Sequence, residues 1–133
     1  MFGQTCAIGE LVMKENQVHA TVGVSDFDAS SAWYARLFGR APDYRPSTSC
    51  AEWQIADSAT IQVMPKNAFL DDRNRSGWAS VGIIVEHLDD ILSELRKRQI
   101  DVAPPHMVTH FVRVAPVTDP DGNRVTFVES IAG

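Results

Sequence analysis

Cysteine, long apolar runs and basic residues are all scarce in this chain. Its two cysteines, Cys6 and Cys50, are too few for a disulfide framework and lack metal-ligand spacing, so we expect reduced thiols without a catalytic role. No stretch reaches the roughly 18 consecutive apolar residues of a membrane span, and Gly9, Glu10 and Lys14 interrupt any signal-peptide core. These absences predict a cytoplasmic protein that does not associate with membranes.

Positive charge is outweighed by negative charge. Twelve basic and seventeen acidic side chains give a formal charge of −5, which disfavours binding to phosphate backbones. The one dense basic run, Arg96-Lys97-Arg98, falls at the end of a predicted helix, where cations complement the helix dipole. We therefore expect no nucleic-acid partner.

What the chain does contain is an internal repeat. When it is shifted by 61 positions, His19–Asp28 lies over Ser80–Asp89, so that Val24 meets Val85 and Asp28 meets Asp89. A repeat of this length indicates two copies of one supersecondary unit. The chain length of 133 residues and the apolar fraction of 44% suit one domain with one core, covering residues 1–133.

Each copy begins with a strand and continues as a helix. In the first copy the side chains alternate between apolar and mostly polar from residue 17 to 24, and apolar residues then recur at helical spacing from Phe27 to Phe38. Gly39 is a typical left-handed helix stop. In the second copy the strand precedes Asp89 and Asp90, which suit the start of the second helix.

Three extended segments follow each helix. The turn Asp119-Pro-Asp-Gly-Asn123 introduces the last of them, because proline and glycine supply the backbone angles that a tight turn needs. The pattern predicts βαβββ twice: module one at about 17–64, a linker at about 65–76 and module two at about 77–130, after an extension of residues 1–16. The predicted extended segments are 42–46, 50–56 and 59–64 in module one, and 101–107, 110–117 and 124–130 in module two.

The residues at these positions carry a family resemblance. Val24-Ser-Asp-Phe-Asp28, Trp33-Tyr34, Leu37-Phe38-Gly39 and the segment Asp119–Glu129 resemble the vicinal-oxygen-chelate superfamily of glyoxalases, bleomycin-resistance proteins and extradiol dioxygenases. The resemblance covers about residues 17 to 130. It implies an α+β fold in which two tandem βαβββ modules form a cup-shaped mixed sheet with the helices outside, and it implies a homodimer.

The resemblance also places four metal-ligand positions, at His19, Gln62, Ser80 and Thr126. An imidazole and an amide oxygen can bind a cation, but the hydroxyls of Ser80 and Thr126 are poor ligands for a divalent transition metal. Glu129 lies three residues after Thr126, so strand alternation turns it to the opposite face. We therefore expect no metal and no other cofactor.

Further ligand-binding candidates are Trp53, Trp78, Phe111 and Arg113. Trp78 shares a strand face with Ser80, whereas core packing is the simpler interpretation of Trp53 and Phe111. Arg113 could bind an anionic ligand or pair with Glu129 or Asp119. His106 and His110 are four residues apart, but the prolines before them favour a turn between strands over a shared metal.

The sequence favours a metal-free small-molecule-binding protein that resembles the bleomycin-resistance branch and holds a planar or amphipathic ligand in a cup. Two alternatives stay open at this point. One is a metal-dependent enzyme of the glyoxalase, lyase or dioxygenase type, and the other is a metal-free enzyme with His19 as general base. The identity of the ligand and the role of residues 1–16 do not follow from the sequence.

Overall fold

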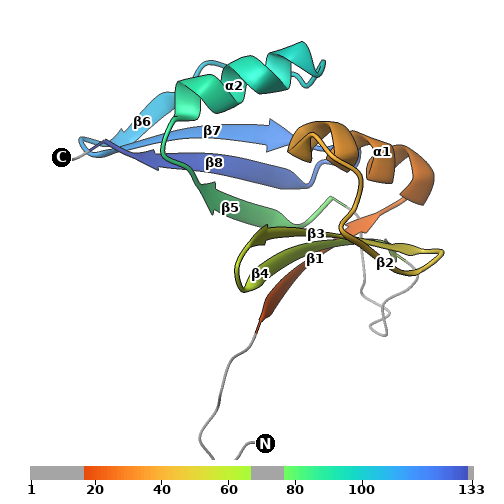
Figure 1. The fold of residues 1–133 in the computed structure, drawn as a ribbon. Helices are drawn as coiled ribbons and strands as arrows, with labels where there is room; N and C mark the ends of the chain where they lie inside the picture. Colours follow the sequence, from red (N-terminus) through yellow and green to blue (C-terminus); the bar gives the residue numbers. More distant parts are fainter. Residues whose placement is uncertain (1–16, 67–76, 132–133) are drawn as a thin grey trace, which may run out of the picture.

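The structure is a computed structural model that describes residues 17–66 and 77–131. The predicted N-terminal extension, Cys6 and nearly all of the predicted linker lie outside the described residues. Figure 1 shows the ten elements of the described part. No helix in the described part is long and apolar enough to span a membrane.

The two predicted βαβββ modules are confirmed. Module one contains β1 (Val18–Val24), α1 (Phe27–Phe38), β2 (Tyr44–Ser47), β3 (Cys50–Ala56) and β4 (Ala59–Pro65). Module two contains β5 (Ser80–Ile84), α2 (Leu88–Lys97), β6 (His106–Thr109), β7 (Val112–Thr118) and β8 (Arg124–Ser130). Each module forms its own four-stranded mixed sheet, in the orders β1-β4-β3-β2 and β5-β8-β7-β6, with β1 parallel to β4 and β5 parallel to β8.

The first predicted extended segment after the second helix differs in its bounds. We expected an extended segment over residues 101–107, but β6 begins only at His106. Pro104 and Pro105 have no backbone N–H to donate, so the ladder with β7 starts after them. His106 begins this strand and His110 lies in the turn that follows it, which agrees with the expected turn between strands.

Local sequence explains where α1 begins and ends. The side chain of Asp26 accepts a hydrogen bond from the backbone N–H of Ala29, and Gly39 ends the helix with a left-handed φ of 72°. The helix α2 has no side-chain cap from His87, the residue before it. Its first N–H, from Leu88, is instead bound by Glu129 of β8 at 3.1 Å.

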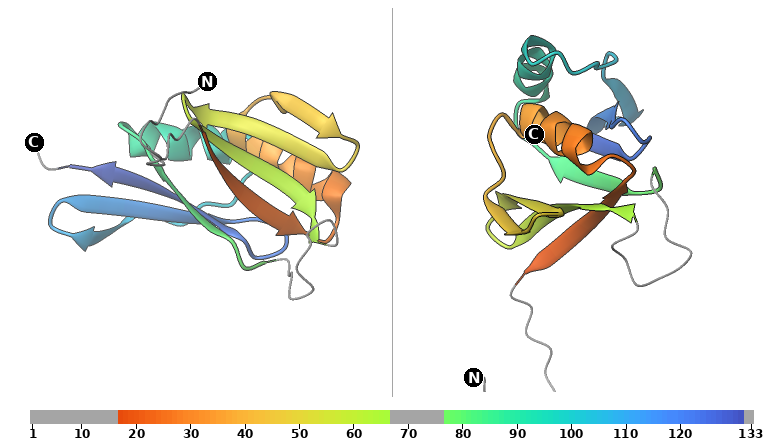
Figure 2. Two further views of the ribbon diagram at one scale, coloured as in Figure 1. Left: turned by 90° about the horizontal axis from the view of Figure 1, so that it is seen from below. Right: turned by 90° about the vertical axis from the view of Figure 1, so that its right-hand side faces the viewer.

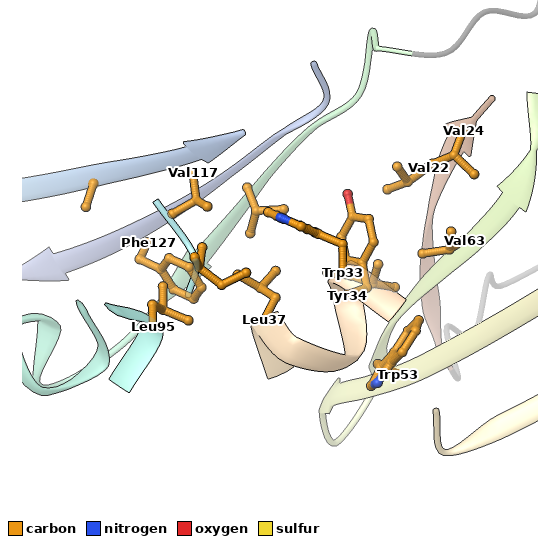
Figure 3. Close-up of a cluster of buried hydrophobic side chains, with 14 of the residues drawn as sticks. Val22, Val24, Trp33, Tyr34, Leu37, Trp53, Val63, Leu95, Val117 and Phe127 are labelled. Carbon is orange, nitrogen blue, oxygen red and sulfur yellow. The ribbon is translucent and has the colours of Figure 1, made fainter. Parts of the chain in front are cut away.

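Both modules contribute to one hydrophobic cluster. Each sheet has its helix on one side, and the view from below in Figure 2 shows both helices behind the strands. Figure 3 shows Tyr34 and Trp33 of α1 between Val63 of the first sheet and Val117 of the second. Because α1 buries side chains against both sheets, it joins the modules through apolar contact.

The turn between β7 and β8 supplies the polar part of this junction. The buried carboxylate of Asp119 accepts hydrogen bonds from the backbone N–H groups of Asp121 and Asn123, at 2.8 and 2.9 Å, and from the Asn123 side chain at 2.9 Å. It also accepts a 2.8 Å hydrogen bond from the hydroxyl of Tyr34, which lies in the other module. The predicted turn therefore also serves as an intermodule bridge.

The same turn holds the ends of two strands. Asn123, which is fully buried, donates to the carbonyl of Gly23 in β1 at 3.0 Å and accepts from the backbone N–H of Ala79 at 2.8 Å. Asp121 binds both the backbone N–H and the hydroxyl of Ser25. Gly77 has a φ of 86°, and a Cβ there would lie 2.4 Å from the Asp121 carbonyl oxygen, so a side chain cannot fit.

The bridge predicts a specific alkaline instability. Burial, and then the Asp119 carboxylate, raise the pKa of Tyr34 well above its ordinary value of 10.0. Tyr34→Phe should lower the free energy of unfolding by about 2 kcal/mol at neutral pH, the usual contribution of a hydrogen bond to a charged group. Above pH 10 the unfolded wild type releases the Tyr34 proton while the folded state retains it, so wild-type stability falls and the gap between the two proteins narrows.

Urea unfolding measured from pH 7 to 11 tests this prediction. The matched control is Tyr44→Phe, because Tyr44 is 55% exposed on β2 and should change stability little. Equal effects of the two substitutions at neutral pH would contradict the assigned role of the Tyr34 hydroxyl.

Candidate functional site

The face of each sheet that points away from the helices carries the four family metal-ligand positions, His19, Gln62, Ser80 and Thr126, and we call it the outer face. In module one, strand alternation places Val22 and Val63 in the core, and Thr21 and Gln62 on the outer face. Thr21 of β1 is paired with Gln62 of β4, which is in turn paired with Glu52 of β3. The outer face therefore has a row of three polar residues from neighbouring strands.

Side-chain hydrogen bonds join these three residues to one another and to Cys50, which lies two residues before Glu52 on β3. We call the four residues Thr21, Gln62, Glu52 and Cys50 the polar row. The hydroxyl of Thr21 donates to Gln62 Oε1 at 2.9 Å, and Gln62 Nε2 donates to Glu52 Oε2 at 2.7 Å. The thiol of Cys50 lies 3.7 Å from the same carboxylate oxygen. Thr21 and Gln62 are half-buried, whereas Glu52 is only 8% and Cys50 only 5% exposed. The row thus becomes more buried toward β3.

Cys50 is a hydrogen-bond donor in this row. Burial, and then the neighbouring Glu52 carboxylate, raise the pKa of its thiol above the ordinary value. A thiol with a raised pKa keeps its proton at neutral pH and is a poor nucleophile. Cys50 forms no disulfide with any described residue.

The outer face of module two has the same register but different residues. Gly82 of β5 is paired with Thr126 of β8, as Thr21 is paired with Gln62 in module one. The next partner of Thr126 is Pro116 of β7, at the place that Glu52 occupies in module one. A Cβ at Gly82 would meet nothing within 4 Å. At these paired positions module two therefore has no carboxylate, and the space above Gly82 is open.

His19 lies on the outer face but does not join the polar row. Its register partner is Thr60, two residues before Gln62 on β4, and its Nε2 atom lies 2.8 Å from Oε1 of Gln17. Within residues 17–66 and 77–131, no hydrogen bond or ion pair joins this imidazole to a carboxylate. Among the described residues the imidazole therefore lacks a carboxylate that would orient it as a general base.

The residues at the four family positions do not fit a transition-metal site. Ser80 and Thr126 offer neutral hydroxyls, and the amide oxygen of Gln62 is already bound by Thr21. Among the described residues, no group of three His, Cys, Asp or Glu side chains comes together. Of the four positions, only His19 retains a strong donor.

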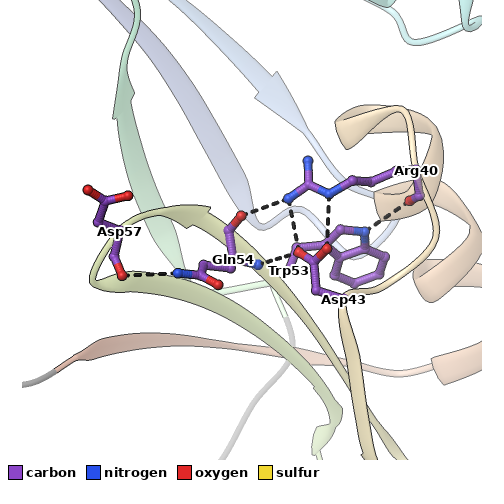
Figure 4. A network of polar contacts seen from close by, with 5 residues as sticks. All are labelled: Arg40, Asp43, Trp53, Gln54 and Asp57. Atoms are coloured by element: carbon purple, nitrogen blue, oxygen red, sulfur yellow. Dashed lines mark hydrogen bonds and ion pairs between the residues drawn. The ribbon is translucent and has the colours of Figure 1, made fainter.

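Trp53 and Arg113, both predicted as ligand-binding, lie on the helix side of the sheets. Trp53 is completely buried, and its indole N–H donates to the Arg40 carbonyl at 3.0 Å, as Figure 4 shows. Arg40 itself binds Asp43 and the Gln54 carbonyl, and this contact lowers the pKa of Asp43. The structure therefore separates Trp53 and Arg113 from the outer face.

The remaining two candidates are exposed. Trp78 precedes β5 and is 73% exposed, and it lies two residues from Ser80 in the chain. Phe111 is 58% exposed in the turn between β6 and β7. Ile84, at the end of β5 on the same face as Ser80, is 80% exposed. The outer face of module two thus has the large apolar side chain of Ile84 in contact with solvent.

Sequence reasoning missed Glu52 and Thr21. The signal was available in β3, where Cys50, Glu52 and Gln54 alternate with Ala51, Trp53 and Ile55. It also missed a cavity of about 290 Å³ on the helix side, which lies between the ends of α1 and α2. The cavity is lined by residues of both modules, including Phe38, Ile55, Ile83, Leu95, Arg98 and Phe127, and by none of the predicted site residues.

Glu129 has a structural role on the helix side. Its carboxylate accepts a hydrogen bond from the Leu88 N–H and forms an ion pair with Arg113 at 2.8 Å. Arg113 also lies 3.3 Å from the Asp89 carboxylate. This geometry confirms that Glu129 faces away from Thr126. The Leu88 N–H, and then Arg113, lower the pKa of Glu129 below its ordinary value of 4.5.

This pKa shift predicts the acid behaviour of the protein. A carboxylate whose pKa is lowered by folding stabilises the fold above its ordinary pKa and loses that contribution as the pH falls further. Glu129→Gln should therefore be less stable than wild type at pH 7, and the difference should shrink as the pH falls below 4.5. Thermal unfolding from pH 7 to 3, with exposed Glu86→Gln as control, measures both effects; a gap that persists at pH 3 would contradict the assignment.

Comparison with known proteins places this geometry in context. Residues 16–127 match the family model described as Glyoxalase/Bleomycin resistance protein/Dioxygenase superfamily. No curated protein matches the chain.

Several solved structures share the fold. A glyoxalase/bleomycin resistance protein from Catenulispora acidiphila DSM 44928 is 31% identical, with a TM-score of 0.74 over 85% of this chain and 96% of that one. A member of the same superfamily from Sphaerobacter thermophilus DSM 20745 is 20% identical, with a TM-score of 0.70 over 90% and 100% of the two chains. TnmS3, an antibiotic binding protein from Streptomyces sp. CB03234, is 19% identical, with a TM-score of 0.69 over 91% and 99%.

Proposed function

Because the chain belongs to the glyoxalase/bleomycin resistance protein/dioxygenase superfamily, we propose that it binds a small molecule without a metal, on the outer face of its sheets. The ligand is a planar or amphipathic molecule. One observation carries the proposal: the four family ligand positions hold one imidazole, one amide and two hydroxyls. Such groups orient a ligand by hydrogen bonding, but they form a poor metal site.

Two further observations support binding. The outer face combines the polar row of module one with the exposed apolar side chain of Ile84 in module two, and Trp78 is exposed just before β5. Small-molecule sites are mostly apolar with a few placed polar groups, and aromatic side chains supply stacking area. Among the proteins that share the fold, TnmS3 is an antibiotic binding protein.

We also propose that a second copy of the chain completes the cup. In one chain the outer face is open, with His19, Ser80 and Gly82 exposed to solvent. Ile84, the last residue of β5, is an apolar side chain that is 80% exposed on this open surface, and exposed apolar surface marks interaction sites. A twofold homodimer covers such a surface and makes two equivalent sites.

We propose a cytoplasmic location for the protein, which suits the free thiol of Cys50.

The absence of a metal site is tested on the purified protein. Elemental analysis should find no stoichiometric ion, and calorimetric titration with zinc, nickel, manganese and iron(II) should give no tight binding. His19→Ala should leave any weak zinc affinity within about twofold of that of the control His110→Ala, which removes an exposed imidazole elsewhere. One tightly held ion per chain that is lost in His19→Ala alone would replace this proposal with a metal enzyme.

The homodimer is tested by placing a charge on the outer face. Wild type should elute at twice the mass of one chain in size-exclusion chromatography with light scattering. Ile84→Glu buries an unpaired charge in the proposed interface and should shift the protein to monomer, with unchanged circular dichroism. The control is Val108→Glu on β6, which is 55% exposed. A monomeric wild type would contradict the dimer.

A further inference from the structure

We propose that Glu52 makes this surface select ligands that carry a cationic, N–H-donating nitrogen, such as a protonated amine or an amidinium group. The inference rests on the proposed binding function, and it adds the chemical class of the ligand. It depends on three properties of Glu52: its burial, its unused hydrogen-bonding capacity and its place in the polar row.

Glu52 is a buried carboxylate, 8% exposed, that forms no ion pair with any residue in 17–66 or 77–131. Arg45 is the basic residue nearest along the chain, but its guanidinium lies over the Phe27 ring at 5.4 Å and is directed to the Thr48 carbonyl. Burial of an unpaired carboxylate costs free energy because the charge loses its hydration. A cationic N–H group that binds Glu52 replaces that hydration with a charge-assisted hydrogen bond.

The hydrogen bonds of Glu52 leave room for a ligand. A carboxylate has about four acceptor positions, and Glu52 receives one strong bond from Gln62 and one weak bond from Cys50. The Thr21 hydroxyl donates to the Gln62 oxygen and so directs the Gln62 NH₂ toward Glu52. This arrangement holds the carboxylate in place and leaves acceptor positions available to a donor from outside the chain.

The polar row gives the ligand a direction. Thr21 and Gln62 are half-buried, so a ligand can lie across them and place its nitrogen at the more buried Glu52. Module two offers no competing anion, because Pro116 occupies the position opposite Thr126 that corresponds to Glu52. Each chain therefore has one cation-selecting end on its outer face.

Three dyes with the same planar ring separate the inference from the proposed function. Acridine is neutral at pH 7.5, 9-aminoacridine is a cation with N–H donors, and acridine-9-carboxylate is an anion. We expect tryptophan fluorescence to be quenched by acridine and by 9-aminoacridine, with the cation bound about tenfold or more tightly, as one charge-assisted hydrogen bond provides. The anion should bind more weakly than acridine.

Glu52→Gln keeps the shape of the side chain and an oxygen for the Gln62 donor, and it should remove the preference for 9-aminoacridine over acridine. Asp101→Asn, at an exposed position after α2, makes the same change in net charge and should keep the preference. Equal binding of the three dyes by wild type would overturn the inference and leave the binding function standing. No binding of any dye would overturn both, and neither wild-type result depends on whether the variant folds.

Discussion

The buried carboxylate of Asp119 is the interaction on which the arrangement of the two modules depends. It receives two backbone and two side-chain hydrogen bonds, one of them from Tyr34 in the other module. These bonds hold the Asp119–Asn123 turn in one shape, and the turn in turn holds the end of β1 through Asn123. Apolar packing of α1 against both sheets supplies the bulk of the junction, and the Asp119 network fixes its geometry.

Because the modules are held together on the helix side of the sheets, the outer faces stay available for ligand binding. Since both helices and the shared core lie on one side of the sheets, the opposite side needs no apolar residues for stability. Module one uses that freedom for Thr21, Gln62 and Glu52, and module two for Gly82 and Thr126. The two modules therefore have equal roles in folding and unequal roles in the proposed binding.

Much of the fold could be predicted because its signals are local or periodic. The repeat that placed Ser80 over His19 also gave the equivalent register of β1 and β5, and strand alternation placed Glu129 opposite Thr126. The site was harder to predict from the sequence, because a side chain such as Arg113 contacts residues of other elements. Arg113 lies against Glu129 and Asp89, and Trp53 lies under α1, which no spacing within β3 or β7 reveals. Glu52 lies outside the family ligand positions, and its place beside Gln62 depends on the pairing of β3 with β4.

The intermodule bridge also has a consequence for synthesis on the ribosome. Gly23 and its partner Asn123 are 100 positions apart, and Tyr34 and Asp119 are 85 apart. While module one emerges, the partners of Gly23 and Tyr34 have not been translated, and the face of α1 that packs on module two stays open. Folding of the first half is therefore completed only when the last strand becomes available. Until then, the domain exposes apolar surface to which molecular chaperones bind.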